Sequence, residues 1–109
     1  MGLPGAGKTT LAQALAPRLN AVVFNADEVR QHLNKDLGFS ELDRIGHARR
    51  MGWLCDQVVR TGSYAIADFV CPTPATRAAF LEGGTAFVIW LRRIERSRFE
   101  DTNRMFTPP

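Results

Sequence analysis

The sequence has little cysteine, little lysine and no long apolar run. Its only cysteines, Cys55 and Cys71, form no C-x-x-C pair and suggest no disulfide framework. No run approaches the roughly 20 apolar residues of a membrane span, so we expect no membrane association. The formal net charge is only +3, without a basic stripe interleaved with aromatics, which argues against a nucleic-acid-binding module. We therefore expect a globular protein of the reducing cytoplasm.

The basic residues that are present are nearly all arginine, 12 of the 14. A planar guanidinium binds phosphate or sulfate through two parallel hydrogen bonds, which an ammonium group cannot do. The bias therefore fits recognition of such anions, although the codon usage of a GC-rich genome explains it equally well.

Residues 2–10 read GLPGAGKTT and match the phosphate-loop pattern G-x-x-x-x-G-K-[ST]. Glycines in such a loop allow successive backbone N–H groups to curl around a polyphosphate, at the start of a helix that itself favours anions. Lys8 adds a charge for the outer phosphates, and the Thr9 hydroxyl is suited to bind Mg²⁺. The predicted nucleotide-binding residues are Gly2, Leu3, Pro4, Gly5, Ala6, Gly7, Lys8, Thr9 and Thr10.

Helical and strand patterns alternate along the chain. We expect helices at 9–19 (closed by Pro17 and Asn20), 27–33, 40–60 and 73–81, strands at 21–24, 64–70 and 86–91, a turn at 82–84 and a charged helical segment at 92–106. This alternation predicts an α/β fold of the P-loop NTPase type, with a parallel sheet between layers of helices.

The phosphate loop stands at the very start of the sequence, although such a loop needs a strand leading into it. Only Met1 precedes Gly2, and the chain stops at Pro109, where a further strand is expected. The interpretation is a single domain over 1–109 that lacks its first strand and is truncated at both ends.

Two carboxylates follow the first two predicted strands. A side chain at the carboxyl end of a parallel strand faces the ligand crevice. Asp27 could orient or deprotonate an attacking hydroxyl or hold Mg²⁺ through water; the alternative is an N-cap for the next helix. Asp68 closes an apolar run in the manner of a Walker B carboxylate, the alternative being a simple strand-end cap. The predicted metal ligands are Thr9, Asp27 and Asp68.

Other candidates for the crevice come from loops and helices. Arg30 and Arg44 lie in the segment expected to overhang it, and Phe39 is either a stacking platform for an aromatic base or a core plug. Cys71 either lines the acceptor pocket or is a small buried residue. The last segment could supply a mobile cationic lid, with solvated helix positions as the alternative for Arg92, Arg93, Arg96, Arg98 and Arg104.

Four stretches together resemble the adenylylsulfate kinases, P-loop enzymes that phosphorylate the 3′-hydroxyl of adenylylsulfate. They are GLPGAGKTTLA from Gly2, DEVRQHLNKDLGFSELDR from Asp27 to Arg44, the pair Arg49-Arg50, and FVCP from Phe69 to Pro72. The resemblance implies ATP as co-substrate, Mg²⁺, a small-molecule acceptor and sulfate activation; a homodimer is left open. It implies catalytic roles for Lys8 and Asp27, and substrate contacts by Arg30, Phe39, Arg44, His47 and Cys71, with Phe39 stacked on adenine.

The sequence departs from that family at several positions. Asn25-Ala26-Asp27 replaces D-G-D, Val70-Cys71-Pro72 replaces Ile-Ser-Pro, His47 replaces an Asn, and Glu100 to Phe106 replaces the lid R-D-x-K-G-L-Y. Two alternatives therefore stay open. One is a P-loop kinase acting on the hydroxyl of a sugar, a nucleoside or a polynucleotide 5′-end. The other is a non-catalytic nucleotide-binding fragment.

Overall fold

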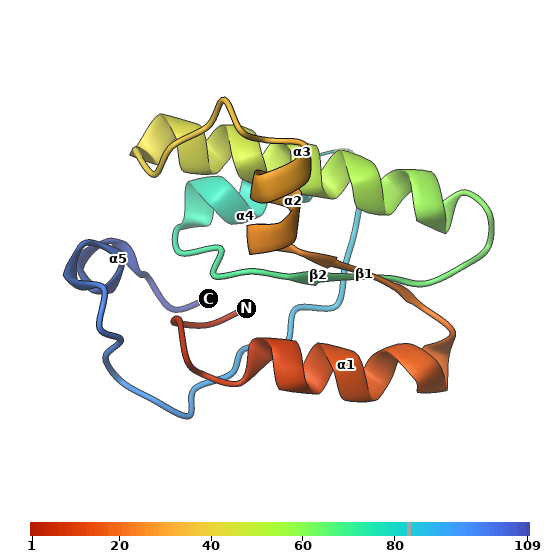
Figure 1. The fold of residues 1–109 in the computed structure, drawn as a ribbon, viewed down its shortest axis with the longest axis horizontal. Coiled ribbons are helices and arrows are strands. Elements are labelled where there is room, and N and C mark those ends of the chain that lie inside the picture. The colour runs from red at the N-terminus through yellow and green to blue at the C-terminus, as the bar shows by residue number, and fades with distance from the viewer. Residues whose placement is uncertain (83) are drawn as a thin grey trace.

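The computed structural model describes residues 1–82 and 84–109 (Figure 1). Helices and strands alternate along most of the chain, as predicted. The elements are α1 (Lys8–Leu19), β1 (Val22–Asn25), α2 (Ala26–His32), α3 (Glu41–Val59), β2 (Ala65–Asp68), α4 (Pro74–Phe80) and α5 (Glu100–Met105).

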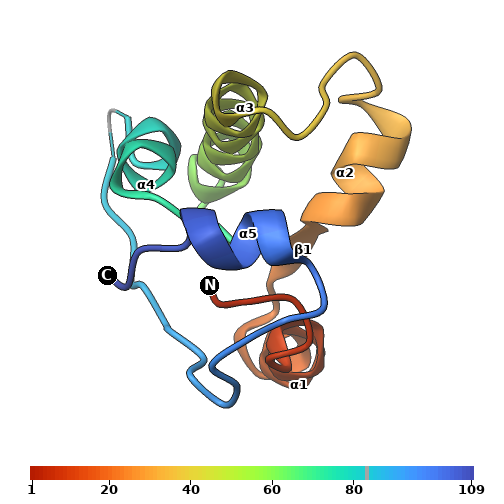
Figure 2. The same cartoon turned by 90° about the vertical axis from the view of Figure 1, so that its left-hand side faces the viewer.

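The two strands are parallel and form the centre of a three-layer arrangement. Their register runs from Val22 beside Ala65 to Asn25 beside Asp68. Helix α1 covers one face of the strands, and α3 and α4 lie on the other (Figures 1 and 2). Because the strands are parallel, their carboxyl ends meet at one edge, which brings Asn25 and Asp68 side by side. The α/β prediction is confirmed.

Local side chains explain where the helices begin and end. Ser40 accepts a hydrogen bond from the Asp43 amide and caps α3. Thr73 and Thr76 form a reciprocal capping box at the start of α4. Asn20 ends α1 in the left-handed conformation, φ 52°. The prediction that Pro17 also closes this helix is wrong: Pro17 is inside α1, whose backbone continues for two more residues.

The core lies between α3 and its neighbours, where Ala48, Met51 and Cys55 are buried. Gly52 faces α4, and a Cβ atom there would collide with the carbonyl group of Phe80. The absence of a side chain at Gly52 therefore lets α4 pack directly on α3. No helix in the described part of the chain is both long and apolar enough to cross a membrane.

Two of the predicted elements are wrong in the C-terminal third. Residues 86–91 form no strand. Among the described residues their backbone is bonded only at one end, where Leu91 N donates to Met1 O (2.9 Å) and Met1 N donates to Ile89 O. A single partner residue is too short for a ladder, so residues 86–89 stay exposed, whereas Trp90 and Leu91 are half-buried.

Within 92–106 only α5 is helical. Asn103 explains why: its side chain bonds the backbone N–H and C=O of Ser97 (both 2.8 Å) and ties the preceding residues into a loop. The predicted turn at 82–84 includes Gly83, which lies outside the described residues. Gly84 N donates to Leu81 O (2.8 Å).

Candidate active site

The phosphate loop leaves its amide groups available to a ligand. A bond from Ala6 N to Leu3 O (3.1 Å) closes the loop, and Gly7, the residue just before α1, is in the left-handed region, φ 98°. Among the described residues, the amides of Gly7, Lys8 and Thr9 have no hydrogen-bond acceptor. Three consecutive free N–H groups at a helix N-terminus form an anion site.

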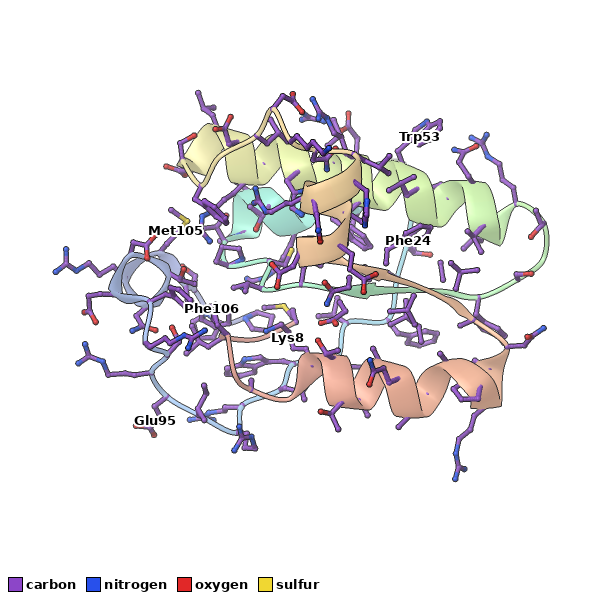
Figure 3. All side chains as sticks on the ribbon, viewed as in Figure 1. Lys8, Phe24, Trp53, Glu95, Met105 and Phe106 are labelled. Atoms are coloured by element: carbon purple, nitrogen blue, oxygen red, sulfur yellow. The ribbon has the colours of Figure 1, made fainter. Side chains whose placement is uncertain are left out.

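Lys8 lies at the start of α1, between that helix and the strands (Figure 3). Its ammonium group donates to Leu3 O (3.0 Å), so the cation is held against the loop. Burial lowers the pKa of Lys8, while the nearby carboxylates of Asp68 and Asp27 oppose this shift. The partly desolvated ammonium is suited to bind a phosphate oxygen.

Thr9 and Asp68 lie together at the carboxyl edge of the strands. Thr9 Oγ1 donates to Asp68 Oδ2 (2.7 Å), and Asn25 Nδ2 donates to the same oxygen (2.8 Å). The sequence singled out Thr9 and Asp68 but not Asn25, whose place beside Asp68 depends on strand register. Hydroxyl and carboxylate oxygens are the ligands that Mg²⁺ prefers, so this pair fits the ion. The described residues contain no cluster of three or more His, Cys, Asp or Glu side chains that could hold a metal alone.

Asn25 also settles the local role of Asp27. Its Oδ1 accepts hydrogen bonds from the amides of Asp27 (3.0 Å) and Glu28 (3.1 Å) and so caps α2. The alternative that Asp27 is the N-cap is therefore wrong. The Asp27 carboxylate is exposed; within the described residues no hydrogen bond joins it to Thr9 or Asp68.

A small cavity of about 80 Å³ lies beside this edge. It brings together every residue predicted for the acceptor side, from two helices and two loops. These residues are Asp27, Arg30, Phe39, Arg44, His47 and Cys71. Cys71 is buried and has a positive φ of 49°, and burial raises the pKa of its thiol.

Two arginines lie near the exposed ring of Phe39. The guanidinium of Arg30 lies 4.4 Å from the ring centroid and that of Arg44 5.6 Å, both within cation–π range. Arg30 also donates to Gly38 O (2.7 Å), and Arg44 to Phe39 O (2.9 Å). Phe39 is 63% exposed, so the alternative that it plugs the core is wrong. Its aromatic face is available at the cavity.

Figure 2 shows α5 in front of the strands, close to the N-terminus. The C-terminal segment contacts the site through two arginine side chains. Arg44 donates to Asp101 Oδ2 (3.3 Å) and to Thr102 Oγ1 (3.2 Å), which joins α5 to α3. Arg93 donates to the carbonyl oxygens of Gly5 and Ala6 in the phosphate loop. Of the five arginines proposed for a lid, Arg93 alone contacts the phosphate loop among the described residues. Arg96 and Arg104 form ion pairs with Glu100 instead.

The family model described as adenylylsulphate kinase matches residues 1–90. The chain belongs to the adenylylsulphate kinase family. It is 43% identical over 81 residues to an adenylyl-sulfate kinase of Synechococcus sp. (strain JA-3-3Ab), a match that covers 70% of this chain and 46% of the relative. The chain thus spans about half the length of the curated relatives it matches.

Solved structures of the family share the fold. A Mycobacterium tuberculosis APS kinase in complex with AMPPNP and APS aligns with a TM-score of 0.79 at 26% identity, over 95% of this chain and 64% of that one. A hexameric APS kinase from Thiobacillus denitrificans aligns with a TM-score of 0.62 at 38% identity, over 73% and 17% of the two chains. These likenesses confirm the predicted P-loop kinase fold.

Proposed function

We propose that this protein transfers the γ-phosphoryl group of ATP to the 3′-hydroxyl of adenylylsulfate. The observation that carries the proposal is that two half-sites, the phosphate loop and the cavity, lie next to each other at the carboxyl edge of the strands. The phosphate loop offers free amides and Lys8, and beside it the cavity offers Asp27, an aromatic ring and two guanidinium groups. An anionic nucleotide acceptor matches that cavity chemistry.

Each residue has a role that follows from its position. The loop amides and Lys8 hold the β- and γ-phosphates, and Arg30 and Arg44 hold the anionic part of the acceptor while Phe39 stacks on its base. Asp27, which is exposed and lines the cavity, orients the attacking hydroxyl and accepts its proton. Alignment of the two reactants contributes on the order of 7–11 kcal/mol to such a transfer.

Thr9 and Asp68 are the residues that would hold Mg²⁺, together with phosphate oxygens of the nucleotide. The ion neutralises charge on the phosphates during transfer. In the ion's absence the Thr9–Asp68–Asn25 hydrogen bonds keep these oxygen ligands together at the strand edge.

The first test replaces Lys8 and Asp27 separately. We expect Lys8→Ala and Asp27→Ala each to lower the rate of formation of 3′-phosphorylated product by at least about 100-fold, because each removes a group acting on reacting atoms. Product is measured by chromatography. Lys35→Ala and Glu28→Gln are matched controls, because Lys35 is the other lysine and Glu28 is the exposed neighbour of Asp27. Unchanged turnover in either test variant refutes the role assigned to that residue.

A second candidate is the same transfer to a different hydroxyl. The residues that favour it are those that depart from the family, notably His47 and the segment from Glu100 to Phe106. Competition between adenylylsulfate and a panel of sugars, nucleosides and polynucleotide 5′-ends separates the two. Faster turnover of another acceptor would favour this candidate, and ATP binding without turnover of any acceptor would favour a non-catalytic role.

A further inference from the structure

Residues 91–94 form a wall along the phosphate loop. A Cβ atom added at Gly2 would lie 2.6 Å from the backbone oxygen of Leu91, so the two backbones are in direct contact there. Farther along, Ile94 is half-buried, and its Cδ1 would lie 3.7 Å from a Cβ atom added at Gly5. This short segment of the C-terminal third therefore follows the outside of the loop for its whole length.

Arg93 adds two hydrogen bonds to this contact. Its Nη2 donates to Gly5 O, and its Nε donates to Ala6 O (3.4 Å). The Gly5 carbonyl belongs to the peptide unit whose N–H, on Ala6, closes the loop through Leu3 O. The Ala6 carbonyl belongs to the next unit, whose N–H, on Gly7, has no acceptor among the described residues. The guanidinium thus holds two successive peptide units from outside, and the second of them presents its N–H to the anion site.

These peptide units are easily turned, because glycines stand on both sides of Ala6. Gly5 has a φ of 85° and Gly7 a φ of 98°, and a glycine accepts either orientation of the peptide unit beside it. A turn of the unit between Ala6 and Gly7 would direct its carbonyl oxygen, in place of its N–H, at a bound polyphosphate. A donor on that oxygen opposes the turn. It also polarises the peptide unit, which makes the Gly7 N–H a stronger donor.

We propose that Arg93 is a positioning residue for the nucleotide: through the carbonyl groups of Gly5 and Ala6 it keeps the Gly7 amide directed at the polyphosphate. It acts through the backbone of the loop and not as a contact to phosphate. This role differs from that of a mobile lid, because the guanidinium is bound to the loop in the protein without ligand. The inference rests on the nucleotide half of the proposed function and is independent of the acceptor.

The first experiment observes the peptide unit between Ala6 and Gly7 by NMR. Ala6-Gly7 is the only Ala-Gly pair in the sequence, so alanine labelled with ¹³C at the carbonyl and glycine labelled with ¹⁵N give a single correlation. We expect Arg93→Met to move the Ala6 carbonyl resonance upfield, as on loss of a hydrogen bond, and Arg93→Lys to restore part of the shift. The matched control is Arg92→Met, because Arg92 is adjacent and exposed and its guanidinium lies 5.4 Å from the Trp90 ring centroid. An unchanged resonance in Arg93→Met, or an equal shift in Arg92→Met, overturns the proposal.

The second experiment measures by calorimetry the affinity for a non-hydrolysable ATP analogue with Mg²⁺ and for inorganic triphosphate. We expect Arg93→Met to weaken the binding of both ligands about tenfold, because the affected amide faces the phosphates and not the base. Arg93→Lys, which keeps a charged donor, recovers most of the affinity, and Arg92→Met binds as the wild type does. Equal affinity in wild type and Arg93→Met, an equal loss in Arg92→Met, or a wild type that binds neither ligand overturns the proposal. Should Arg93→Met fail to fold, Arg93→Ser takes its place in both measurements.

The transfer assay distinguishes a failure of this inference from a failure of the proposed function. A wild type that binds the ATP analogue but forms no 3′-phosphorylated adenylylsulfate would contradict the proposed function, while the affinity of Arg93→Met still decides the role of Arg93. Product formation by the wild type together with an unchanged affinity in Arg93→Met would contradict the role of Arg93 alone.

Discussion

At the scale of single residues, Asn25 links the end of β1 to Asp68 and to the start of α2. Its amide nitrogen bonds Asp68, and its amide oxygen caps α2 through Asp27 and Glu28. A second carboxylate at this position could accept from the helix amides but could not donate to Asp68. The amide thus allows one acidic group, Asp68, to lie beside Thr9 without a like charge against it.

His47 makes a prediction about stability at low pH. Its pKa is about 6.5 in the unfolded chain and about 4 in the folded protein, so the unfolded state binds the proton first as the pH falls. The resulting stability is complete above pH 6.5 and is lost as the pH falls toward 4, by on the order of 3 kcal/mol. Urea unfolding of wild type and His47→Gln across this range measures the loss.

The difference in unfolding free energy between wild type and His47→Gln reports on His47 alone, because the carboxylates that also titrate are common to both proteins. His32→Gln is the control, since His32 is exposed. Parallel pH dependence of wild type and His47→Gln would show that His47 is not held neutral in the folded state.

At the scale of elements, α5 contacts Arg44, a residue that lines the cavity, through one buried and one exposed group. Thr102 is 5% exposed, whereas the Asp101 side chain, paired with Arg44, is 70% exposed. The cavity of about 80 Å³ is smaller than the roughly 300 Å³ at which ligand pockets begin. Binding of the proposed acceptor therefore requires the cavity to widen, and the contact of α5 with Arg44 is one that would limit this widening.

Replacing Asp101 tests this gating contact. We expect Asp101→Asn to change unfolding free energy by less than about 1 kcal/mol, because the Asp101 side chain is largely exposed, and to tighten adenylylsulfate binding by up to about fivefold, because Arg44 loses one of its partners. Calorimetry measures the affinity. Glu100→Gln, on the same helix and not bonded to Arg44, is the control. Weaker binding in Asp101→Asn would mean that α5 belongs to the closed, ligand-bound site.

Elements with strong local signals could be predicted from the sequence, and those that depend on distant partners could not. The phosphate loop, the Ser40 cap and the parallel strands follow from local pattern. Residues 86–91 have the apolar composition of a strand, but in the described chain they find a backbone partner only in Met1. The candidate site follows the same division. The sequence singled out Thr9 and Asp68. It did not predict that Asn34 contacts His47 or that Arg50 donates to Asn34, because both contacts depend on how the loop after α2 packs on the middle of α3.

At the scale of the whole molecule, the two half-sites lie on the same edge of the strands. The phosphate loop leads into α1 on one face, and the residues of the cavity come from segments that include α2 and α3 (Figure 1). Apolar side chains of Phe87, Val88 and Ile89 are exposed beside the backbone of Met1, away from the lining of the cavity. The chemistry is thus concentrated at one end of the sheet.

The most direct test of the account follows the γ-phosphoryl group itself. The protein is incubated with Mg²⁺, adenylylsulfate and ATP labelled in its γ-phosphate, and the products are separated. The account predicts that the label appears on the 3′-oxygen of adenylylsulfate, and that omission of Mg²⁺ or the change Lys8→Ala abolishes this transfer. Label that stays on ATP, or that passes only to water, would contradict it.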